Sequence, residues 1–353
     1  WTINGKVSAE PDGALLLSKG ASAVLNPELN EGAFKDFEMT FKVRTLNGSM
    51  GFAAFHSDAA FSKGYKIAID NSRDSKAWWR KTGSLLGVRN VVKRMANDGE
   101  WAEIRAKVSG NLVEIFVNGK QLVEYAEPEE PYRTPENKGM RLGEGAIGVK
   151  CSSGGGIEIR DFKVRRLKPS AARAEAEPES ADGAIGLHQS DFPAVDYHVH
   201  LKGDLDAQKA QKQARKYGIN YIVAVNCGKD FPVNKDSLAI EFIEKNKSDP
   251  YILAMQAEGR EWMKLITKPA REKFAYVFTD GMTFEDRDGN RVHLWVPKEV
   301  KIKDRQEYMD MIVEKICGVL GEPADIYANA TYLPDALSAD YAKLWTKERR
   351  QKV

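Results

Sequence analysis

Apolar and polar residues alternate along the first half of the chain. The alternation is clearest in DFEMTFKVR (36–44), WAEIRAKV (101–108) and NLVEIFVNG (111–119). A period of two places successive side chains on opposite faces of a strand, and the Gly, Asn, Asp and Ser clusters between the runs mark turns. Asn118 and Gly119 can both take positive φ, so residues 113–125 are expected to form a tight hairpin. Residues 1–167 therefore predict an all-β antiparallel sandwich of the jelly-roll type.

The rhythm changes after this region. Residues 168–192 are rich in Ala, Glu, Pro and Ser. Such a composition predicts a solvated linker, with some helix around 171–177. From about Pro193 apolar runs alternate with amphipathic ones, such as the helical DAQKAQKQARKYG (206–218) that ends in the natural cap Gly218. Residues 193–353 therefore predict an α/β domain.

This second region holds five strand–helix units. Closing a barrel of this kind usually takes about eight strands. The sheet is therefore expected to be open, or the chain to be a piece of a longer protein whose TIM-like barrel is incomplete here; we favour the second interpretation.

Composition narrows the function classes. The 353 residues suit two domains. A net charge of +2 argues against a protein that binds nucleic acid through phosphate contacts. No apolar run reaches the ~18 residues of a membrane span. The chain starts at Trp1 and contains no signal peptide; a mature exported protein would start in this way, so we expect a periplasmic or secreted location. The oligomeric state is not predicted.

The first region resembles a known family. DFEMTFKVRTLNGSMGFAAFHS (36–57), KGYKIAIDN (63–71) and GAIGVKCSSGGGIEIRDFKVRRL (145–167) are similar, in order and spacing, to the 3-keto-disaccharide hydrolase family. The resemblance implies a concanavalin-like jelly roll that acts on or binds sugars. Lys66 and Ala68 stand where this family often has an acidic residue and a Gln, which argues against a general acid or base at these positions.

A sugar-binding surface combines aromatic faces with converging polar groups. The candidates in this region are His56, Lys66, Asp70, Asn71, Trp78, Trp79, Lys81 and Arg89. The alternative is that one of the two tryptophans belongs to the core and the polar residues are ordinary strand surface.

The stretch VDYHVHL (195–201) carries two of the five histidines. In a strand, Asp196, His198 and His200 share one face. The first strand of an α/β domain is usually buried on both faces, where ionisable groups are costly unless they bind a partner. A divalent metal is such a partner for two histidines, and we expect Zn²⁺ or Mn²⁺. A third ligand is required. Candidates near the ends of later strands are Glu258, Glu261, Asp280, Asn329 and His293.

DYHVHL (196–201) and GREW (259–262) resemble the His-x-His and Gly-x-Glu motifs of the polymerase-and-histidinol-phosphatase (PHP) hydrolases, relatives of the amidohydrolases. The resemblance implies that His198 and His200 bind a metal and that Glu261 binds or bridges it. The later motifs of that family are absent, which leaves a complete site, and an occupied metal, open in this chain.

Two main hypotheses follow. In the first, the protein is a hydrolase of glycosides or keto-glycosides: the sandwich binds the sugar, the α/β domain holds the metal, and Glu258 or Asp280 handles the proton. In the second, it is a non-catalytic carbohydrate-binding protein with an inactive PHP-like domain. A third interpretation places catalysis in the sandwich, near His56 and Asp70.

Overall fold

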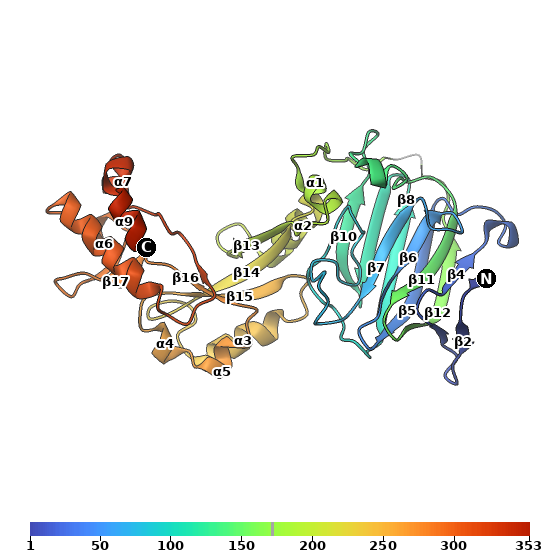
Figure 1. The fold of residues 1–353 in the computed structure, drawn as a ribbon, viewed down its shortest axis with the longest axis horizontal. Coiled ribbons are helices and arrows are strands. Elements are labelled where there is room, and N and C mark those ends of the chain that lie inside the picture. Colours follow the sequence, from blue (N-terminus) through green and yellow to red (C-terminus); the bar gives the residue numbers. More distant parts are fainter. Residues whose placement is uncertain (171–172) are drawn as a thin grey trace. The chain divides into compact units, whose positions relative to one another are not determined.

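The chain divides into two compact units in the computed structural model, which describes residues 1–170 and 173–353 (Figure 1). The first unit comprises Trp1–Tyr197, Leu201–Tyr221 and Asp249–Ile252. The second comprises His198–His200, Ile222–Ser248 and Leu253–Val353. The predicted boundaries of a domain at 1–167, a linker at 168–192 and a domain at 193–353 stay a prediction.

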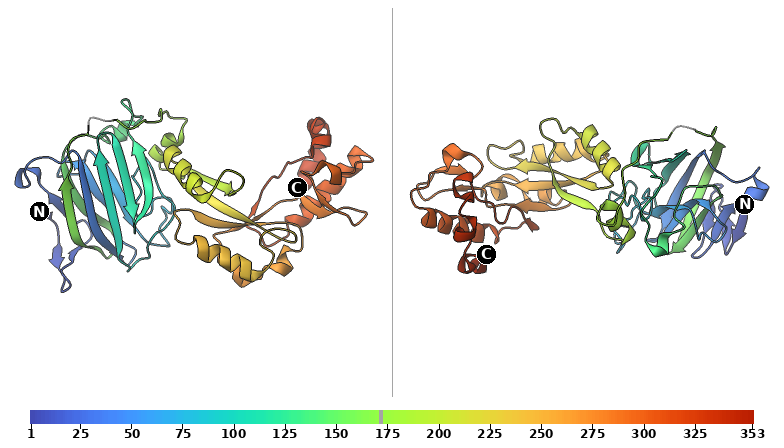
Figure 2. Two further views of the ribbon diagram at one scale, coloured as in Figure 1. Left: turned by 180° about the vertical axis from the view of Figure 1, so that it is seen from behind. Right: turned by 90° about the horizontal axis from the view of Figure 1, so that it is seen from above.

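The first unit is built on two antiparallel sheets that face each other, as the further views in Figure 2 show. The five-stranded sheet has the order β1 (Thr2–Asn4), β4 (Ser22–Leu25), β11 (Ala146–Ser153), β6 (Met50–Ser57), β7 (Tyr65–Asp70). The seven-stranded sheet has the order β10 (Lys120–Ala126), β9 (Leu112–Val117), β8 (Ala102–Ser109), β5 (Phe37–Leu46), β12 (Gly156–Arg166), β3 (Leu15–Leu17), β2 (Val7–Ala9). The short 3-10 helices η1 (Pro27–Leu29) and η2 (Pro135–Asn137) lie in the connections. The predicted jelly-roll-like sandwich is confirmed.

The alternating sequence pattern accounts for these strands. Side chains of β5 alternate strictly between buried and half-buried, so Phe37 and Phe41 reach the core between the sheets. Asn118 and Gly119 have φ of 49° and 77°, which gives β9 and β10 the predicted tight hairpin. Leu85 forms isolated bridges with Ile67 of β7 and with Arg89.

Residues 173–192, which belong to the predicted linker, make specific contacts with the sandwich. Ile185 of helix α1 (Ala184–Gln189) belongs to the sandwich core. The Glu179 carboxylate accepts hydrogen bonds from Arg133 Nη1, Tyr125 Oη and the backbone N–H of Tyr132, each of 2.9 Å. Composition cannot reveal such contacts, because they depend on partners far away in the sequence. The predicted helix around 171–177 begins outside the described residues, and residues 173–177 are not helical.

A second five-stranded sheet has its strands in chain order: β13 (Val195–Val199), β14 (Asn220–Cys227), β15 (Ile252–Ala257), β16 (Val277–Thr279), β19 (Ile326–Tyr327). The pairs β15–β16 and β16–β19 are parallel. The intervening elements are α2 (Ala207–Tyr217), α3 (Asp236–Asn246), α4 (Trp262–Leu265), α5 (Lys268–Arg271), the hairpin β17 (Thr283–Glu285) and β18 (Arg291–His293), η3 (Pro297–Glu299) and α6 (Arg305–Val319). In Figures 1 and 2, α3 and α5 lie side by side, and Phe242 stacks on Phe274 there.

One expectation about this sheet needs correction. Strand β13 is an edge strand, and Asp196, Tyr197 and His198 are exposed, so it is not buried on both faces.

Three short helices lie within residues 335–352: α7 (Asp335–Ser338), α8 (Tyr341–Leu344) and α9 (Lys347–Lys352). Helix α8 ends at Leu344, and Trp345, with φ of −80° and ψ of 68°, is buried in the core around α6.

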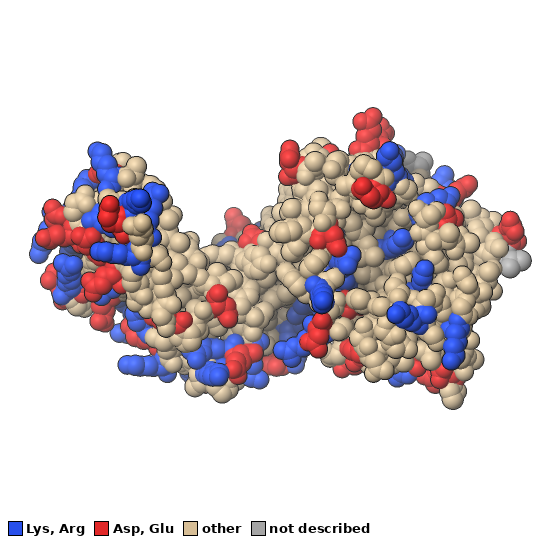
Figure 3. All heavy atoms as spheres, in the orientation of Figure 1, with Lys and Arg blue, Asp and Glu red and all other residues tan. Residues whose placement is uncertain are grey.

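Acidic and basic side chains are interspersed on the face that Figure 3 shows, in keeping with the near-balanced charge. Within the described residues, no helix combines the length and the apolar character that crossing a bilayer requires.

Candidate functional site

The two histidines of the second unit converge. Nε2 of His198 and Nε2 of His200 lie 2.9 Å apart, and the ring centroids are 4.9 Å apart at 71°. The ring of His198 also packs edge-on against Phe278 of β16, at 4.5 Å between centroids. His198 lies in β13 and His200 follows directly after its end, and their imidazoles converge, as the sequence predicted.

A chain of amide and carboxylate groups continues from the histidines. Gln256 of β15 presents Oε1 to His198 Nε2 at 3.1 Å and donates from Nε2 to Asp280 Oδ2 at 3.3 Å. Asn329 donates to the same Asp280 oxygen at 3.0 Å. Asp280 is 2% exposed. The ends of four strands thus bring together five polar side chains in one network: His198, His200, Gln256, Asp280 and Asn329.

These hydrogen bonds fix proton positions. Nδ1 of His200 faces the carbonyl oxygen of Ala224 at 3.1 Å, so Nδ1 carries the proton and Nε2 presents a lone pair. Gln256 Oε1 is an acceptor, because the amide nitrogen is directed at Asp280. His198 Nε2 faces two acceptors, the Nε2 of His200 and the Oε1 of Gln256, and this arrangement therefore places the proton on it.

The predicted third ligand lies elsewhere. Glu261 forms an ion pair with Arg291, with Oε1 and Nη1 2.6 Å apart, and the Arg291 guanidinium helps to hold the pKa of Glu261 below its usual value, although burial opposes this. His293 pairs with Glu299 at 2.7 Å. In the part of the chain that the structure describes, no three His, Cys, Asp or Glu side chains form a group able to hold a metal ion.

Glu258 is a second buried carboxylate of this unit. It is 3% exposed and accepts hydrogen bonds from Asn226 Nδ2 at 2.7 Å and Thr283 Oγ1 at 3.3 Å. Asp280, the other carboxylate proposed for proton transfer, is joined to the histidines through Gln256.

Gln256 is the residue that the sequence analysis missed. An amide within the apolar run ILAMQA (252–257) stands out, and its spacing of two from Glu258 places both on one side of β15. It was not among the predicted ligands, because carboxylates and histidines are the more usual metal ligands.

The donor set fits a divalent ion incompletely. Two imidazole nitrogens and one amide oxygen converge within about one coordination sphere. The Nδ1–H of His200 on a carbonyl is the usual outer support of a metal-ligating histidine. No carboxylate is part of this donor set. The nearest one in the network, Asp280, is hydrogen-bonded to Gln256.

The predicted sugar-facing residues of the sandwich do not form one surface. His56 is 3% exposed; Nδ1 accepts from Gly143 N–H at 3.1 Å, and Nε2 donates to Lys35 O at 2.7 Å. Burial lowers the pKa of His56. The ring therefore acts as a neutral structural bridge between loops.

Asp70, Asn71 and Lys81 form a separate buried network. Lys81 Nζ lies 3.2 Å from Asp70 Oδ2 and 2.6 Å from Ser72 O, and Thr82 Oγ1 donates to Asn71 Oδ1 at 2.6 Å. Asp70 therefore has a cation partner of its own and lies in a network apart from His56, which removes the geometric basis for a joint site at these two residues.

The other four candidates are scattered. The Trp79 indole donates to Asp191 at 3.0 Å and meets the exposed Trp78 edge-on. Lys66 is half-buried over the Phe52 ring, where burial lowers the pKa of Lys66. Arg89 is buried against Tyr125, 5.0 Å from its ring centroid.

Comparisons with known proteins concern the first half of the chain. The family model of the 3-keto-alpha-glucoside-1,2-lyase-like domain matches residues 1–165. A candidate glycosyl hydrolase of Parabacteroides distasonis is 15% identical with a TM-score of 0.39, over 46% of this chain and 83% of its own. A second one from that organism is 19% identical with a TM-score of 0.37, over 47% and 93%.

A carbohydrate-binding module from Bacillus subtilis is 15% identical with a TM-score of 0.34, over 46% of this chain and 94% of its own. No curated protein matches the chain. No finding supports the resemblance of the second half to PHP hydrolases. Residues 1–165 are similar to the 3-keto-alpha-glucoside-1,2-lyase-like domain, which confirms the resemblance inferred for the first half.

Proposed function

We propose that the protein hydrolyses carbohydrate-derived substrates, with the sandwich binding the sugar and the second unit carrying the hydrolytic site. The observation that carries the proposal is the convergence of His198 and His200 on Gln256, which links them to the buried Asp280. The family match of residues 1–165 supports a sugar-related substrate, and 3-keto-α-glucosides are the class that its name suggests.

Asp280 is the group that would accept a proton from the attacking water. Its two oxygens already accept hydrogen bonds from Gln256, Asn329 and the backbone N–H of Met282. Those bonds hold the carboxylate in one orientation, which is what proton transfer to a bound water requires. Glu258, the other carboxylate predicted for this role, would position Asn226 and Thr283.

His198, His200 and Gln256 would hold a divalent ion such as Zn²⁺ or Mn²⁺. Such an ion lowers the pKa of a bound water and polarises the bond to be cut. To hold such an ion, His198 would have to carry its ring proton on Nδ1 and present the Nε2 lone pair, as His200 does with its Nδ1 on the Ala224 carbonyl.

The test is hydrolysis of methyl 3-keto-α-glucoside and of methyl α-glucoside by the full chain supplied with Zn²⁺ or Mn²⁺. Asp280→Asn and His198→Ala are expected to lower kcat by about 100-fold or more. His293→Ala, which removes a histidine outside the network, is the matched control and should keep full activity. Turnover that survives in both network variants would end the proposal.

A second candidate function is carbohydrate binding without catalysis. It is favoured by Lys66 and Ala68 at the positions where the resembled family has an acidic residue and a Gln, and by the pairing of Asp70 with Lys81. Calorimetric titration with the same two glucosides separates the two functions: binding without turnover, with and without metal, is the outcome expected for a lectin-like protein.

A further inference from the structure

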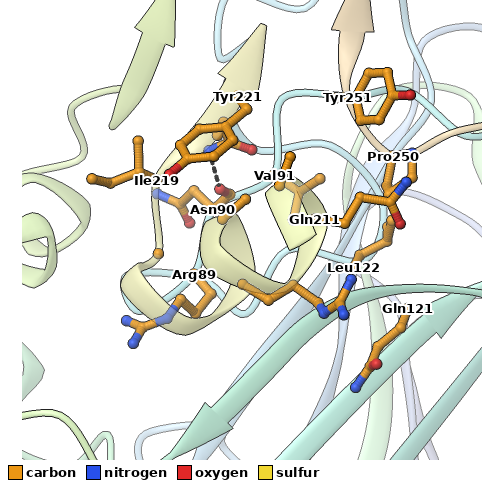
Figure 4. Close-up of a pocket in the computed structure, with 15 residues that line it drawn as sticks. Arg89, Asn90, Val91, Gln121, Leu122, Gln211, Ile219, Tyr221, Pro250 and Tyr251 are labelled. Carbon is orange, nitrogen blue, oxygen red and sulfur yellow. Dashed lines mark hydrogen bonds between the residues drawn. The ribbon is translucent and has the colours of Figure 1, made fainter. Parts of the chain in front are cut away.

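A pocket in the first unit is lined by charged and polar side chains that neither the family match nor the proposed hydrolytic site explains. It is bounded by the loop around Asn90, strand β10 and helix α2 (Figure 4). The polar side chains among its lining residues are Arg89, Asn90, Gln121, Gln211, Arg215, Asn220, Tyr221 and Tyr251. Figure 4 shows Gln211 and Gln121 reaching toward the pocket from α2 and β10, with Tyr221 and Tyr251 at its other end.

The lining is cationic. It contains two arginines and no Asp or Glu. Arg89 is 9% exposed and donates only to backbone carbonyls, those of Val88 at 2.9 Å and Lys216 at 3.4 Å. In the described ranges no carboxylate forms an ion pair with Arg89, and burial lowers the pKa of its guanidinium. Burial of this cation is costly and the nearby Glu179 carboxylate offsets the cost only in part, so an anion bound in the pocket would stabilise Arg89.

Arg215 is similar. Its closest carboxylate is Glu124, at 4.0 Å from Nε, which is too long for a hydrogen bond. Burial lowers the pKa of Arg215 as well, and Glu124 offsets this only in part.

Three donors of the lining have no hydrogen-bond partner: Arg89 Nε, Asn90 Nδ2 and Arg215 Nε. Asn90 is 3% exposed. Its Oδ1 accepts from Gly87 N–H at 3.2 Å, and its backbone oxygen accepts from Asn220 Nδ2 at 2.8 Å, the dashed line of Figure 4. These bonds hold the side chain in place and leave Nδ2 as the end that needs an acceptor. Each buried unsatisfied donor costs about 1–3 kcal/mol.

The pocket therefore offers unpartnered donors and positive charge, and no carboxylate is among its lining residues. Its volume of about 40 Å³ equals that of roughly three buried waters, at about 10–15 Å³ each, so it holds one small group and not a sugar ring. We propose that this pocket binds a small oxyanion, the carboxylate or phosphate group of a ligand, through Arg215, Asn90 and Arg89. The proposal is independent of the hydrolytic site and goes beyond it.

The test is calorimetric titration of the full chain at low ionic strength with acetate, inorganic phosphate and glucuronate, and with acetamide as the neutral analogue of acetate. Anion binding with no binding of acetamide is expected. Comparison of the anions identifies the group that the pocket prefers. Binding of acetate and glucuronate indicates a carboxylate, and tighter binding of inorganic phosphate indicates a phosphate.

Two variants connect binding to the pocket. Arg215→Gln removes one positive charge, and Asn90→Asp keeps the acceptor for Gly87 N–H while replacing the unpartnered donor by a negative charge. Both should weaken binding about 10-fold or more. Lys212→Gln removes a charge from an exposed position of the same helix and should leave binding unchanged.

Three outcomes would overturn the proposal: equal binding of acetamide, no anion binding up to 50 mM (roughly the weakest affinity worth assigning to a site), or equal weakening by Lys212→Gln. Should Asn90→Asp unfold, Arg215→Gln against Lys212→Gln decides alone.

Discussion

Nε2 of His198 lies 2.9 Å from Nε2 of His200 and faces Gln256 Oε1 at 3.1 Å. One nitrogen with one proton thus serves two acceptors. If His198 bound a divalent ion through Nε2, its ring proton would have to be on Nδ1.

Replacing Gln256 by Glu is the sharpest test of the proposed ion site. The substitution keeps the side-chain length and supplies the missing carboxylate, so we expect affinity for Zn²⁺ or Mn²⁺ to rise at least about 10-fold. Without metal the variant places a second carboxylate beside Asp280 and should melt at a lower temperature than the parent. Metal titration and melting curves with and without the ion measure both effects. Unchanged affinity would show that Gln256 is not a ligand.

Acidification is expected to destabilise the first unit through His56 and His188. Both rings accept a backbone N–H at Nδ1 and donate to a carbonyl at Nε2. Burial lowers the pKa of His56, and it lowers that of His188 to about 4. Unfolded histidines titrate near about 6.5. Below that pH the unfolded chain binds protons that the folded one does not, so the free energy of unfolding falls as the pH falls; above it these residues contribute no pH dependence.

For His188 the free energy of unfolding keeps falling down to about pH 4, which is the pKa of this residue in the folded protein. The slope is at most about 1.4 kcal/mol per pH unit. Urea unfolding at pH 7.5 and 5.5 measures it. His188→Gln keeps a polar side chain without a titrating group and should show a shallower pH dependence. An unchanged slope in that variant would contradict the assignment.

Arg133→Ala should be strongly destabilising. Arg133 is ion-paired with Glu179 at 2.9 Å, lies 3.7 Å from Glu127, and donates to Tyr65 Oη at 2.6 Å. Its loss leaves two buried carboxylates without a cation, which typically costs about 3–5 kcal/mol. The exposed Arg141, whose side chain donates to the Glu129 carbonyl at 3.0 Å, is the control, and Arg141→Ala should cost less than about 0.5 kcal/mol. Urea unfolding gives both values; similar ones would mean that the Arg133 network contributes little.

Gly218→Ala and Gly119→Ala form a matched pair. Both glycines have positive φ, 70° and 77°, so either alanine costs about 1–2 kcal/mol of backbone strain. At Gly218 a Cβ would also lie 2.9 Å from Arg89 Cδ, whereas nothing lies within 4 Å at Gly119. We expect Gly218→Ala to cost about 1–3 kcal/mol more. Equal losses in thermal or urea unfolding would show that Arg89 moves aside freely.

Local patterns predicted the elements well. The strict alternation of β5, the Asn118–Gly119 hairpin and the helix α2 capped by Gly218 all follow from periodicity and turn chemistry, which act over a few residues. What the sequence could not predict depends on distant partners. Glu261, the expected third ligand, forms a salt bridge with Arg291 instead. Gln256 contacts His198 because β15 and β13 end near each other.

The sugar-facing set was misjudged for a similar reason. Residue types suited to sugars are equally suited to buried polar networks, and Asp70, Lys81 and His56 serve such networks here. Burial decides between the two uses, and alternation alone does not give the burial of loops.

The hydrogen bonds of Glu179 have a practical consequence for dissecting the protein. A fragment ending at residue 167 would carry the whole of both sandwich sheets, yet it would lack the carboxylate that neutralises Arg133 and the isoleucine that seals the core at Ile185. Such a fragment should be less soluble and should melt earlier than one extended through Ser190. The smallest autonomous folding piece of the N-terminal half is therefore longer than its strands.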